Sequence, residues 1–246
     1  MTLASYLIAF ALSAGFLPGS SETTPVLLEL FTSLGCSSCP PADKLLAEID
    51  RRQPIPGARL IVLSEHVDYW NSIRWSDPFS SDIYTQRQQA YATRFGMEIY
   101  TPQLVVDGAK ALLGSDWPKV ENAVAESLRG AKIPVQLTGA RTEKTAQVKV
   151  EIGRNSSDKK GVVFLALAHD HAQSHVGGGE NAGRDISEVA VAYSIKQLGK
   201  IDAQSTFIKS LSIELPSNSQ AGDLRVIAFV RKSDTMQVIG ADELVF

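Results

Sequence analysis

The stretch FTSLGCSSCPPAD, residues 31–43, contains the two cysteines of the chain, Cys36 and Cys39, with two residues between them. The segment before it, PVLLELFTS (residues 25–33), is a short apolar run that ends in turn-forming residues, which predicts a buried strand. The segment after it, PADKLLAEIDRR (residues 41–52), places its apolar side chains on one face, which predicts a helix. The cysteine pair therefore lies between a strand and a helix.

The two prolines that follow the cysteines help to locate the start of this helix. Pro40 and Pro41 lack the amide hydrogen that a helix interior requires, but the first turn of a helix can accommodate them. We therefore predict that the helix begins near Ser37 or Ser38, with a serine as its N-cap. Both sulfur atoms would then lie at the N-terminus of the helix.

A thiol at a helix N-terminus has a defined chemistry. The first N–H groups of a helix are unpaired and its dipole is positive there, so a thiolate is stabilised and its pKa is lowered. We expect Cys36, on the exposed side of the turn, to attack a substrate and Cys39 to resolve the mixed disulfide. The protein would be a thiol–disulfide oxidoreductase with a redox-active disulfide and no further cofactor. Its substrate would be a protein or small-molecule thiol or disulfide, and it would need a redox partner.

Other roles stay open for the pair. A disulfide across two residues closes a small ring, so it is a weak structural staple. Zinc sites commonly use four ligands, and the chain has no third cysteine. Copper binds both cysteine and histidine, so a copper-binding protein or copper chaperone that uses Cys36, Cys39 and His66 is an alternative. A third hypothesis is a redox-inert binding module in which the disulfide stays closed.

The chain separates into two parts of different pattern. The order strand, helix, strand, helix, strand, strand, helix indicates an α/β domain over residues 22–131. From residue 132 to residue 246, strand-like alternation between polar turns predicts a mainly β, sandwich-like domain. The other elements expected in the first part are a strand at residues 58–67, helices at residues 77–96 and 116–130, and a hairpin turn at Asp107 and Gly108.

Several short motifs connect the chain to a known family: ELFTSLGCSSCPPAD, HVDYW, DPF, RQQAYA, YTPQLVVDG and GENAGR. In these motifs the chain resembles the secreted thioredoxin-like family catalogued as domain of unknown function 1223. The resemblance implies a thioredoxin-like fold for residues 26–128 and a thiol–disulfide redox class, whereas the biological role of the family is open. It also implies a cis peptide bond at Pro102, facing the disulfide, which leaves neighbouring backbone groups free to pair with a substrate peptide.

Glu29 is a candidate for the proton transfer that this chemistry needs. It lies seven residues before Cys36 on the predicted strand, and thioredoxins carry a buried acid on the equivalent strand. A half-buried carboxyl group with a raised pKa would take the proton from Cys39. The alternative is that Glu29 faces solvent or a salt-bridge partner.

Polar residues in two further segments are candidates for substrate contacts. The second predicted strand ends at the edge where open α/β sheets carry their sites. The glycine-rich segment VGGGENAGR, residues 176–184, predicts a flexible loop that reaches over the first domain. Together with Thr101, these segments contribute His66, Asp68, Tyr69, Trp70, Glu180, Asn181 and Arg184. We interpret a separate histidine group, His169, His171 and His175, as a polar hairpin tip rather than as a metal site.

Net charge and the N-terminal apolar segment indicate where the protein acts and what it does not bind. The formal net charge of −3 argues against a nucleic-acid-binding surface, which normally carries a basic excess. The apolar run LASYLIAFALSAGFL (residues 3–17), followed by small polar residues, predicts a secretory signal peptide over residues 1–21. The alternative is an N-terminal helix or membrane tether. We expect a periplasmic or secreted protein that has no contact with a membrane after cleavage.

Overall fold

The computed structural model describes residues 23–157, 160–217 and 219–246. The predicted signal peptide lies outside these residues, so it stays a prediction. The first half follows the predicted element order: β1 (Thr24–Thr32), α1 (Pro40–Arg52), β2 (Ala58–His66), α2 (Asp82–Phe95), β3 (Gln103–Val106), β4 (Lys110–Leu113) and α3 (Trp117–Ser127). The described part of the second half forms β5 (Val135–Arg141), β6 (Thr145–Ile152), β7 (Gly161–His175), β8 (Asp185–Ile201), β9 (Phe207–Glu214), β10 (Leu224–Lys232) and β11 (Val238–Val245).

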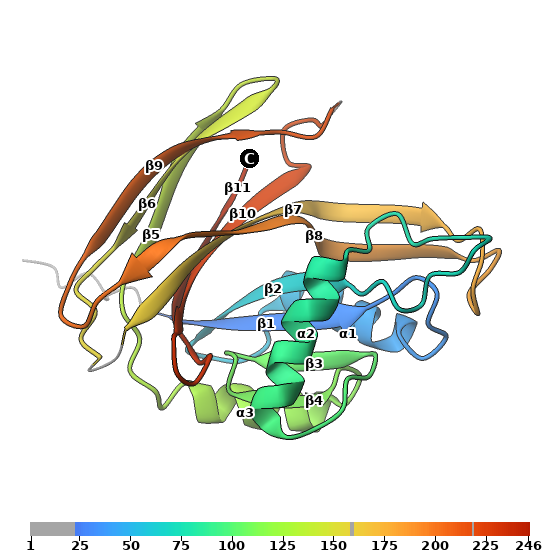
Figure 1. The fold of residues 1–246 in the computed structure, drawn as a ribbon, viewed down its shortest axis with the longest axis horizontal. Coiled ribbons are helices and arrows are strands. Elements are labelled where there is room, and N and C mark those ends of the chain that lie inside the picture. Colours follow the sequence, from blue (N-terminus) through green and yellow to red (C-terminus); the bar gives the residue numbers. More distant parts are fainter. Residues whose placement is uncertain (1–22, 158–159, 218) are drawn as a thin grey trace, which may run out of the picture.

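The expected fold class, a thioredoxin-like α/β domain followed by a mainly β domain, is wrong. One eight-stranded mixed sheet combines strands from both halves of the chain, in the order β11-β10-β7-β8-β2-β1-β3-β4 (Figure 1). The two halves meet where β8 runs parallel to β2, with Val191 opposite Ser64. The Ser64 hydroxyl donates to the Val189 carbonyl at 2.9 Å. With eleven strands and three helices among the described residues, the protein is mainly β.

A second sheet, with the order β5-β6-β9, packs against the part of the large sheet that comes from the second half of the chain. Alternate residues of β6, such as Val148 and Val150, share a core with Leu165 of β7 and Val226 of β10. Figure 1 shows the second sheet to one side of the large sheet, away from the three helices. The expected boundary near residue 131 falls in the loop between α3 and β5.

The helices cover both faces of the sheet around β1. Leu28 and Leu30 share a core with α1 and α3, for example with Leu46 of α1. Phe31 points to the opposite face and packs edge to face on Tyr91 of α2, with 6.0 Å between ring centroids. Because successive side chains of a strand alternate between faces, β1 is buried on both sides. This explains its nearly continuous apolar sequence.

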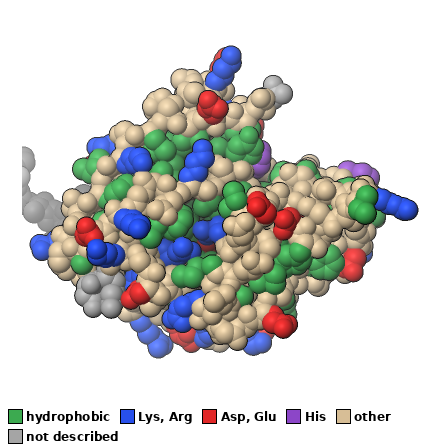
Figure 2. Space-filling view, in the orientation of Figure 1, with side chains coloured by type: hydrophobic (Ala, Val, Ile, Leu, Met, Phe, Trp, Pro, Cys, Tyr) green, Lys and Arg blue, Asp and Glu red, His purple; other side chains and the backbone are tan. Residues whose placement is uncertain are grey.

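The outer surface of the described residues carries mixed charge. On the face seen in Figure 2, Lys and Arg side chains are scattered among acidic, apolar and neutral ones rather than joined into one patch. Within the described ranges, the three helices are too short or too polar to cross a lipid bilayer.

Candidate functional site

Cys36 and Cys39 form a disulfide bond at the N-terminus of α1. The prolines occupy the first turn as predicted, but the helix begins only at Pro40 and Cys39 is its N-cap residue. The predicted serine N-cap is therefore wrong. The reason is that the disulfide closes residues 36–39 into a turn, in which the Cys39 amide donates to the Cys36 carbonyl at 3.2 Å. Ser37 and Ser38 lie within that turn and are exposed.

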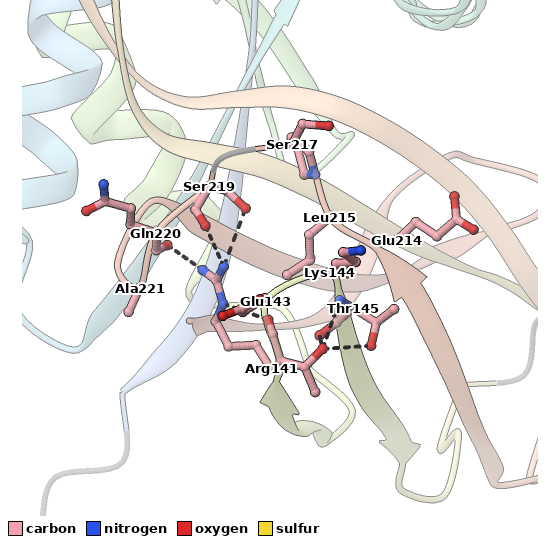
Figure 3. Close-up of a pocket in the computed structure, with 12 residues that line it drawn as sticks. Arg141, Glu143, Lys144, Thr145, Glu214, Leu215, Ser217, Ser219, Gln220 and Ala221 are labelled. Carbon is pink, nitrogen blue, oxygen red and sulfur yellow. Dashed lines mark hydrogen bonds between the residues drawn. The ribbon is translucent and has the colours of Figure 1, made fainter.

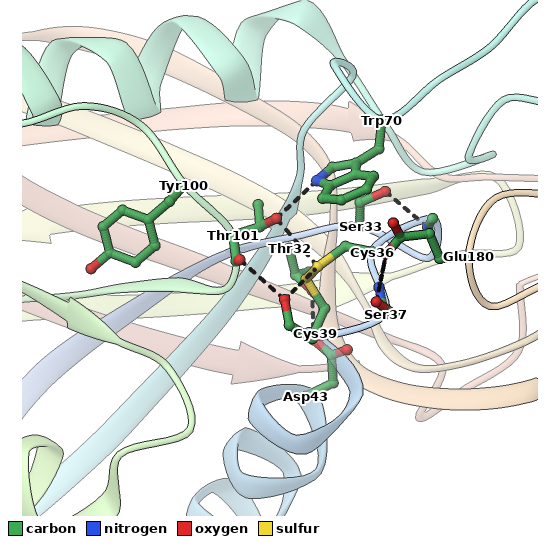
Figure 4. The surroundings of a disulfide bond; sticks show 12 residues. Thr32, Ser33, Cys36, Ser37, Cys39, Asp43, Trp70, Tyr100, Thr101 and Glu180 are labelled. Carbon is green, nitrogen blue, oxygen red and sulfur yellow. Dashed lines mark hydrogen bonds between the residues drawn. A yellow bond between two sulfur atoms is a disulfide. The ribbon is translucent and has the colours of Figure 1, made fainter.

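Two hydroxyl groups contact the sulfur of Cys36 (Figure 4). The Thr101 hydroxyl donates to Cys36 Sγ at 3.3 Å, and Ser38 Oγ lies 3.3 Å from the same atom. The indole N–H of Trp70 donates to Thr101 Oγ1 at 2.8 Å and fixes its orientation. The Thr101–Pro102 peptide bond is cis, as the resemblance implied. Cys36 thus has hydroxyl groups beside its sulfur in addition to the nearby helix N-terminus.

Residues 176–184, which we call the strap, lie directly against the disulfide loop. The Asn181 side-chain amide donates to the Cys36 carbonyl at 2.7 Å. The Glu180 carboxylate accepts hydrogen bonds from the Ser37 amide at 3.1 Å and from the Ser37 hydroxyl at 2.5 Å. The segment predicted to reach over this region therefore does so, and its side chains bind the backbone on both sides of Cys36.

Both cysteines are more buried than expected. Cys36 and Cys39 both have 0% of their surface accessible, so the prediction of an exposed Cys36 is wrong. The third predicted strap residue, Arg184, supports the contact indirectly, because its guanidinium donates to Asn181 Oδ1 at 3.0 Å. A substrate sulfur can reach Cys36 only if the strap or its neighbours move.

Glycine residues allow this close approach. Gly179 has a φ of +73°, and a Cβ atom at this position would lie 2.8 Å from the Cα atom of Gly35. A Cβ atom at Gly178 would lie 2.6 Å from the Cβ of Trp75. Larger residues would push the strap away from the disulfide, so the run of glycines serves packing as well as flexibility.

A group of buried ionisable side chains lies behind the disulfide. Asp43 of α1 accepts a hydrogen bond from the Thr32 hydroxyl at 2.8 Å. The two ring nitrogens of His66 lie 2.8 Å from Asp77 Oδ2 and 3.1 Å from Glu188 Oε1. All four ionisable residues are buried. The group therefore brings together residues of α1, β2 and β8 near the disulfide.

Burial sets the protonation of this group. It raises the pKa of Asp43 to about 8, and the negative charge of Glu188 acts in the same direction. Burial alone would lower the pKa of His66, but the carboxylates of Glu188 and Asp77 raise it well above its usual value. Burial opposes ionisation of Asp77, yet its pKa is lowered because of the charge on His66. These shifts favour the charged form of His66 between its two carboxylates and the protonated form of Asp43.

Three members of this group could not be recognised from local sequence patterns. Asp43 has the usual place of an acidic residue in the first turn of a helix, where it complements the dipole. Asp77 and Glu188 lie in a loop and on β8, and only the tertiary fold brings them to His66. Asp77 followed by Pro78 would have suggested a turn rather than a buried ion pair.

Glu29 lies elsewhere. On β1 it points to the face covered by α2, where the Tyr91 hydroxyl donates to it at 2.6 Å and Arg87 forms an ion pair with it. It is fully buried. Thr32, three residues further along the strand, points to the opposite face and contacts α1 through Asp43. The structure thus places Asp43, rather than Glu29, on the disulfide side of the sheet.

The remaining predicted contact residues are only partly brought together. Trp70 and Thr101 adjoin Cys36, whereas Asp68 turns toward α2 and accepts a hydrogen bond from the Thr85 hydroxyl at 2.6 Å. Tyr69 is 41% exposed. The separate histidine group lies along β7, not at a hairpin tip: His169 is close to two aromatic rings, whereas His171 and His175 are exposed.

The structure offers little support for a copper site. Both ring nitrogens of His66 already face carboxylates within 3.1 Å. Among the residues that the structure describes, no cluster of three or more His, Cys, Asp or Glu side chains has an arrangement that could hold a metal ion. A set of Cys36, Cys39 and His66 would require the buried ion pairs to break.

A pocket of 1180 Å³ lies between the β5–β6 turn and the residues after β9 (Figure 3). Its lining residues are far in sequence from Cys36 and Cys39. Arg141 crosses it and donates to the Ser219 carbonyl at 2.7 Å and to the Gln220 carbonyl. Neither cysteine lines it. Its main polar side chain is occupied in holding two loops together, so we do not assign a function to it.

Comparison with known proteins agrees with the motifs. Residues 27–231 match the family described as "Protein of unknown function (DUF1223)". The chain belongs to this family. A solved structure of the protein AGR_C_4864 from Agrobacterium tumefaciens is similar, with a TM-score of 0.69 and 26% identity over 92% of this chain and 96% of that one. HBP35 of Porphyromonas gingivalis has a similar fold, with a TM-score of 0.62 and 16% identity over 93% and 77% of the two chains. No curated protein matches the sequence.

Proposed function

We propose that this member of the family is a thiol–disulfide oxidoreductase that acts in the periplasm or outside the cell through Cys36 and Cys39. The observation that carries the proposal is the surrounding of Cys36 Sγ. This sulfur is disulfide-bonded beside the N-terminus of α1 and lies 3.3 Å from the hydroxyls of Ser38 and Thr101. A helix N-terminus and hydroxyl donors both stabilise a thiolate. The apolar run near the N-terminus supports the location outside the cytosol.

The exchange proceeds in two steps. A substrate thiolate attacks Cys36 Sγ, the Cys36–Cys39 bond breaks, and its electron pair leaves on Cys39 Sγ. A second substrate thiol then attacks the mixed disulfide and releases Cys36 as a thiolate. The substrate dithiol is thereby oxidised to a disulfide and the cysteine pair is reduced. The reverse sequence reduces a substrate disulfide, with Cys36 as the attacking thiolate and Cys39 as the resolving one.

Turnover of a disulfide substrate tests the proposal. In dithiothreitol, the wild type is expected to accelerate the reduction of insulin, because the dithiol reduces Cys36 and Cys39, which then reduce insulin. The double variant Cys36→Ser/Cys39→Ser should leave the rate at that of dithiothreitol alone. Circular dichroism of the variant controls for folding. Equal rates with the folded wild type and the folded double variant would overturn the proposal.

Access to Cys36 gives a second prediction. Glu180→Ala removes the carboxylate that accepts two hydrogen bonds from Ser37, and both residues are exposed, so the fold should persist. We expect tris(2-carboxyethyl)phosphine to reduce the disulfide several-fold faster in this variant than in the wild type. Glu143→Ala, which removes an exposed acid at the β5–β6 turn, is the matched control. Identical reduction rates in all three proteins would show that the strap does not limit access.

A redox-inert binding module is the second candidate function, because both cysteines of the disulfide are fully buried. Structural disulfides usually have reduction potentials below about −300 mV, whereas exchange-active ones are less negative. Equilibration of the protein with dithiothreitol redox buffers would measure this potential. A value well below that limit, with no insulin reduction, would favour the redox-inert module over the oxidoreductase.

A further inference from the structure

Asp43 is the first acidic residue of α1 after Cys39. The two residues are four apart at the start of α1, so their side chains lie on the same face of the helix, one turn apart. The Asp43 amide donates to the Cys39 carbonyl at 3.1 Å, and the Asp43 side chain is held by the Thr32 hydroxyl at 2.8 Å. Figure 4 shows Asp43 below Cys39, at the start of the helix.

The charges around Asp43 oppose its ionisation. From β8, Glu188 contributes a negative charge, and one of its oxygens lies 3.1 Å from His66 Nε2 without the geometry of a hydrogen bond. From the loop before α2, Asp77 contributes another. Two features act in the opposite direction: the positive charge of His66 on β2, which also faces these two carboxylates, and the N-terminal dipole of α1. From β1, Thr32 offers a neutral hydroxyl. Burial and this surplus of negative charge raise the pKa of Asp43 to about 8.

We propose that Asp43 carries the proton that passes to and from Cys39 Sγ during disulfide exchange, and that Glu188 is the positioning residue that keeps this proton on Asp43. The inference rests on the proposed function, because it assigns a role within that exchange. It replaces Glu29, which faces the other side of the sheet, with a residue on the disulfide side. It also gives the second half of the chain a part in the chemistry through β8.

The proton of Asp43 would neutralise the thiolate that the exchange creates on Cys39. When a substrate thiolate attacks Cys36 Sγ, the electron pair of the broken bond leaves on Cys39 Sγ, in a fully buried position. The carboxyl proton of Asp43 passes to this sulfur, which leaves a Cys39 thiol and an Asp43 carboxylate. Asp43 regains a proton from solvent after the substrate disulfide departs. In the opposite direction the Asp43 carboxylate takes the proton of Cys39 before Cys39 attacks the mixed disulfide.

A chemical reductant tests this without any assumption about the natural substrate. The rate of disulfide reduction is measured from pH 5 to pH 9 at low dithiothreitol, where it is proportional to reductant, and is divided by the dithiothreitol thiolate concentration. For the wild type we expect this normalised rate to be constant at low pH and to fall as pH rises through about 8, where Asp43 loses its proton. Asp43→Asn should lower the normalised rate at low pH about 100-fold, the usual scale of one acid–base group, and remove its decrease with pH.

Two further variants separate proton transfer from structural damage. Glu188→Gln keeps Asp43 but removes the nearby charge, so the fall should move to lower pH while the low-pH value is retained. Glu65→Gln is the matched control, because Glu65 is also a buried acid, with a pKa raised to about 7, but lies against Arg87. It should leave the fall in place. If Asp43→Asn or Glu188→Gln shows the wild-type profile, the proposal is overturned.

The result is independent of the insulin assay. A wild-type protein that fails to turn over insulin but shows the Asp43-dependent profile would contradict the proposed function and support the proton assignment. Insulin turnover with an unchanged profile in Asp43→Asn would do the reverse. Should Asp43→Asn fail to fold, the shift expected in Glu188→Gln decides the proposal alone.

Discussion

Cys36→Ser is expected to abolish disulfide turnover, whereas Cys39→Ser should stop the reaction at a stable mixed disulfide. Both sulfurs are buried, so exposure does not distinguish them. The hydroxyls of Ser38 and Thr101 distinguish the two sulfurs, because both hydroxyls contact Cys36 Sγ. In the Cys36→Ser variant no sulfur lies beside these hydroxyls, and turnover should fall on the order of 1,000-fold or more, to the rate without protein.

The two single variants control for each other. Each breaks the same disulfide and therefore loses the same cross-link, so a difference between them reports chemistry rather than stability. Incubation with a disulfide reagent, followed by mass spectrometry without reductant, measures the adduct. Cys39→Ser should form one adduct per chain, at Cys36, much faster than Cys36→Ser forms one at Cys39. The opposite order would assign the attacking role to Cys39.

The contrast between Glu29 and Asp43 shows how far local pattern predicts this site. Glu29 lies on a strand before the cysteine pair and Asp43 on a helix after it. Both residues are buried because they lie in buried parts of these elements. Whether Glu29 faces the disulfide depends on which face of β1 carries its side chain, since a shift of one residue moves every side chain to the other face. The equivalence of Glu29 with the buried acid of thioredoxins depends on the length of the loop before Cys36, and this length decides the face. Asp43 required knowledge of Glu188, which no local pattern relates to α1.

The fold itself shows the same limit. The order of elements through α3 was predictable, because each strand and helix has its own hydrophobic period. Hydrophobic periodicity does not reveal which strands are neighbours in the sheet. β8, whose 17 residues pair with β7 along most of their length, also reaches β2 and so merges what looked like two domains into one sheet. The strap lies between β7 and β8, and this pairing carries it over Cys36.

Arg87→Met is expected to cause a large loss of stability that is independent of the redox chemistry. Arg87 binds Glu65 at 2.7 Å and also Glu29, and both carboxylates are fully buried. Its guanidinium lies 5.7 Å from the ring centroids of Phe164 and Phe229, so methionine can fill the space between them. Removing one partner of a buried ion pair leaves the other charge uncompensated, which typically costs roughly 3–5 kcal/mol in the free energy of unfolding.

The pH dependence of this loss distinguishes an uncompensated charge from poor packing. Burial raises the pKa of Glu65 to about 7 in the folded wild type, although Arg87 opposes the rise. Without Arg87 this folded-state pKa rises further above the unfolded value, so stability is lost as pH rises through that interval. Urea unfolding should therefore show a larger deficit for Arg87→Met at pH 8 than at pH 5. In the triple variant Glu29→Gln/Glu65→Gln/Arg87→Met the pH-dependent part should disappear. A deficit that is equal at both pH values would mean that packing around the phenylalanine rings, rather than charge, is what Arg87 contributes.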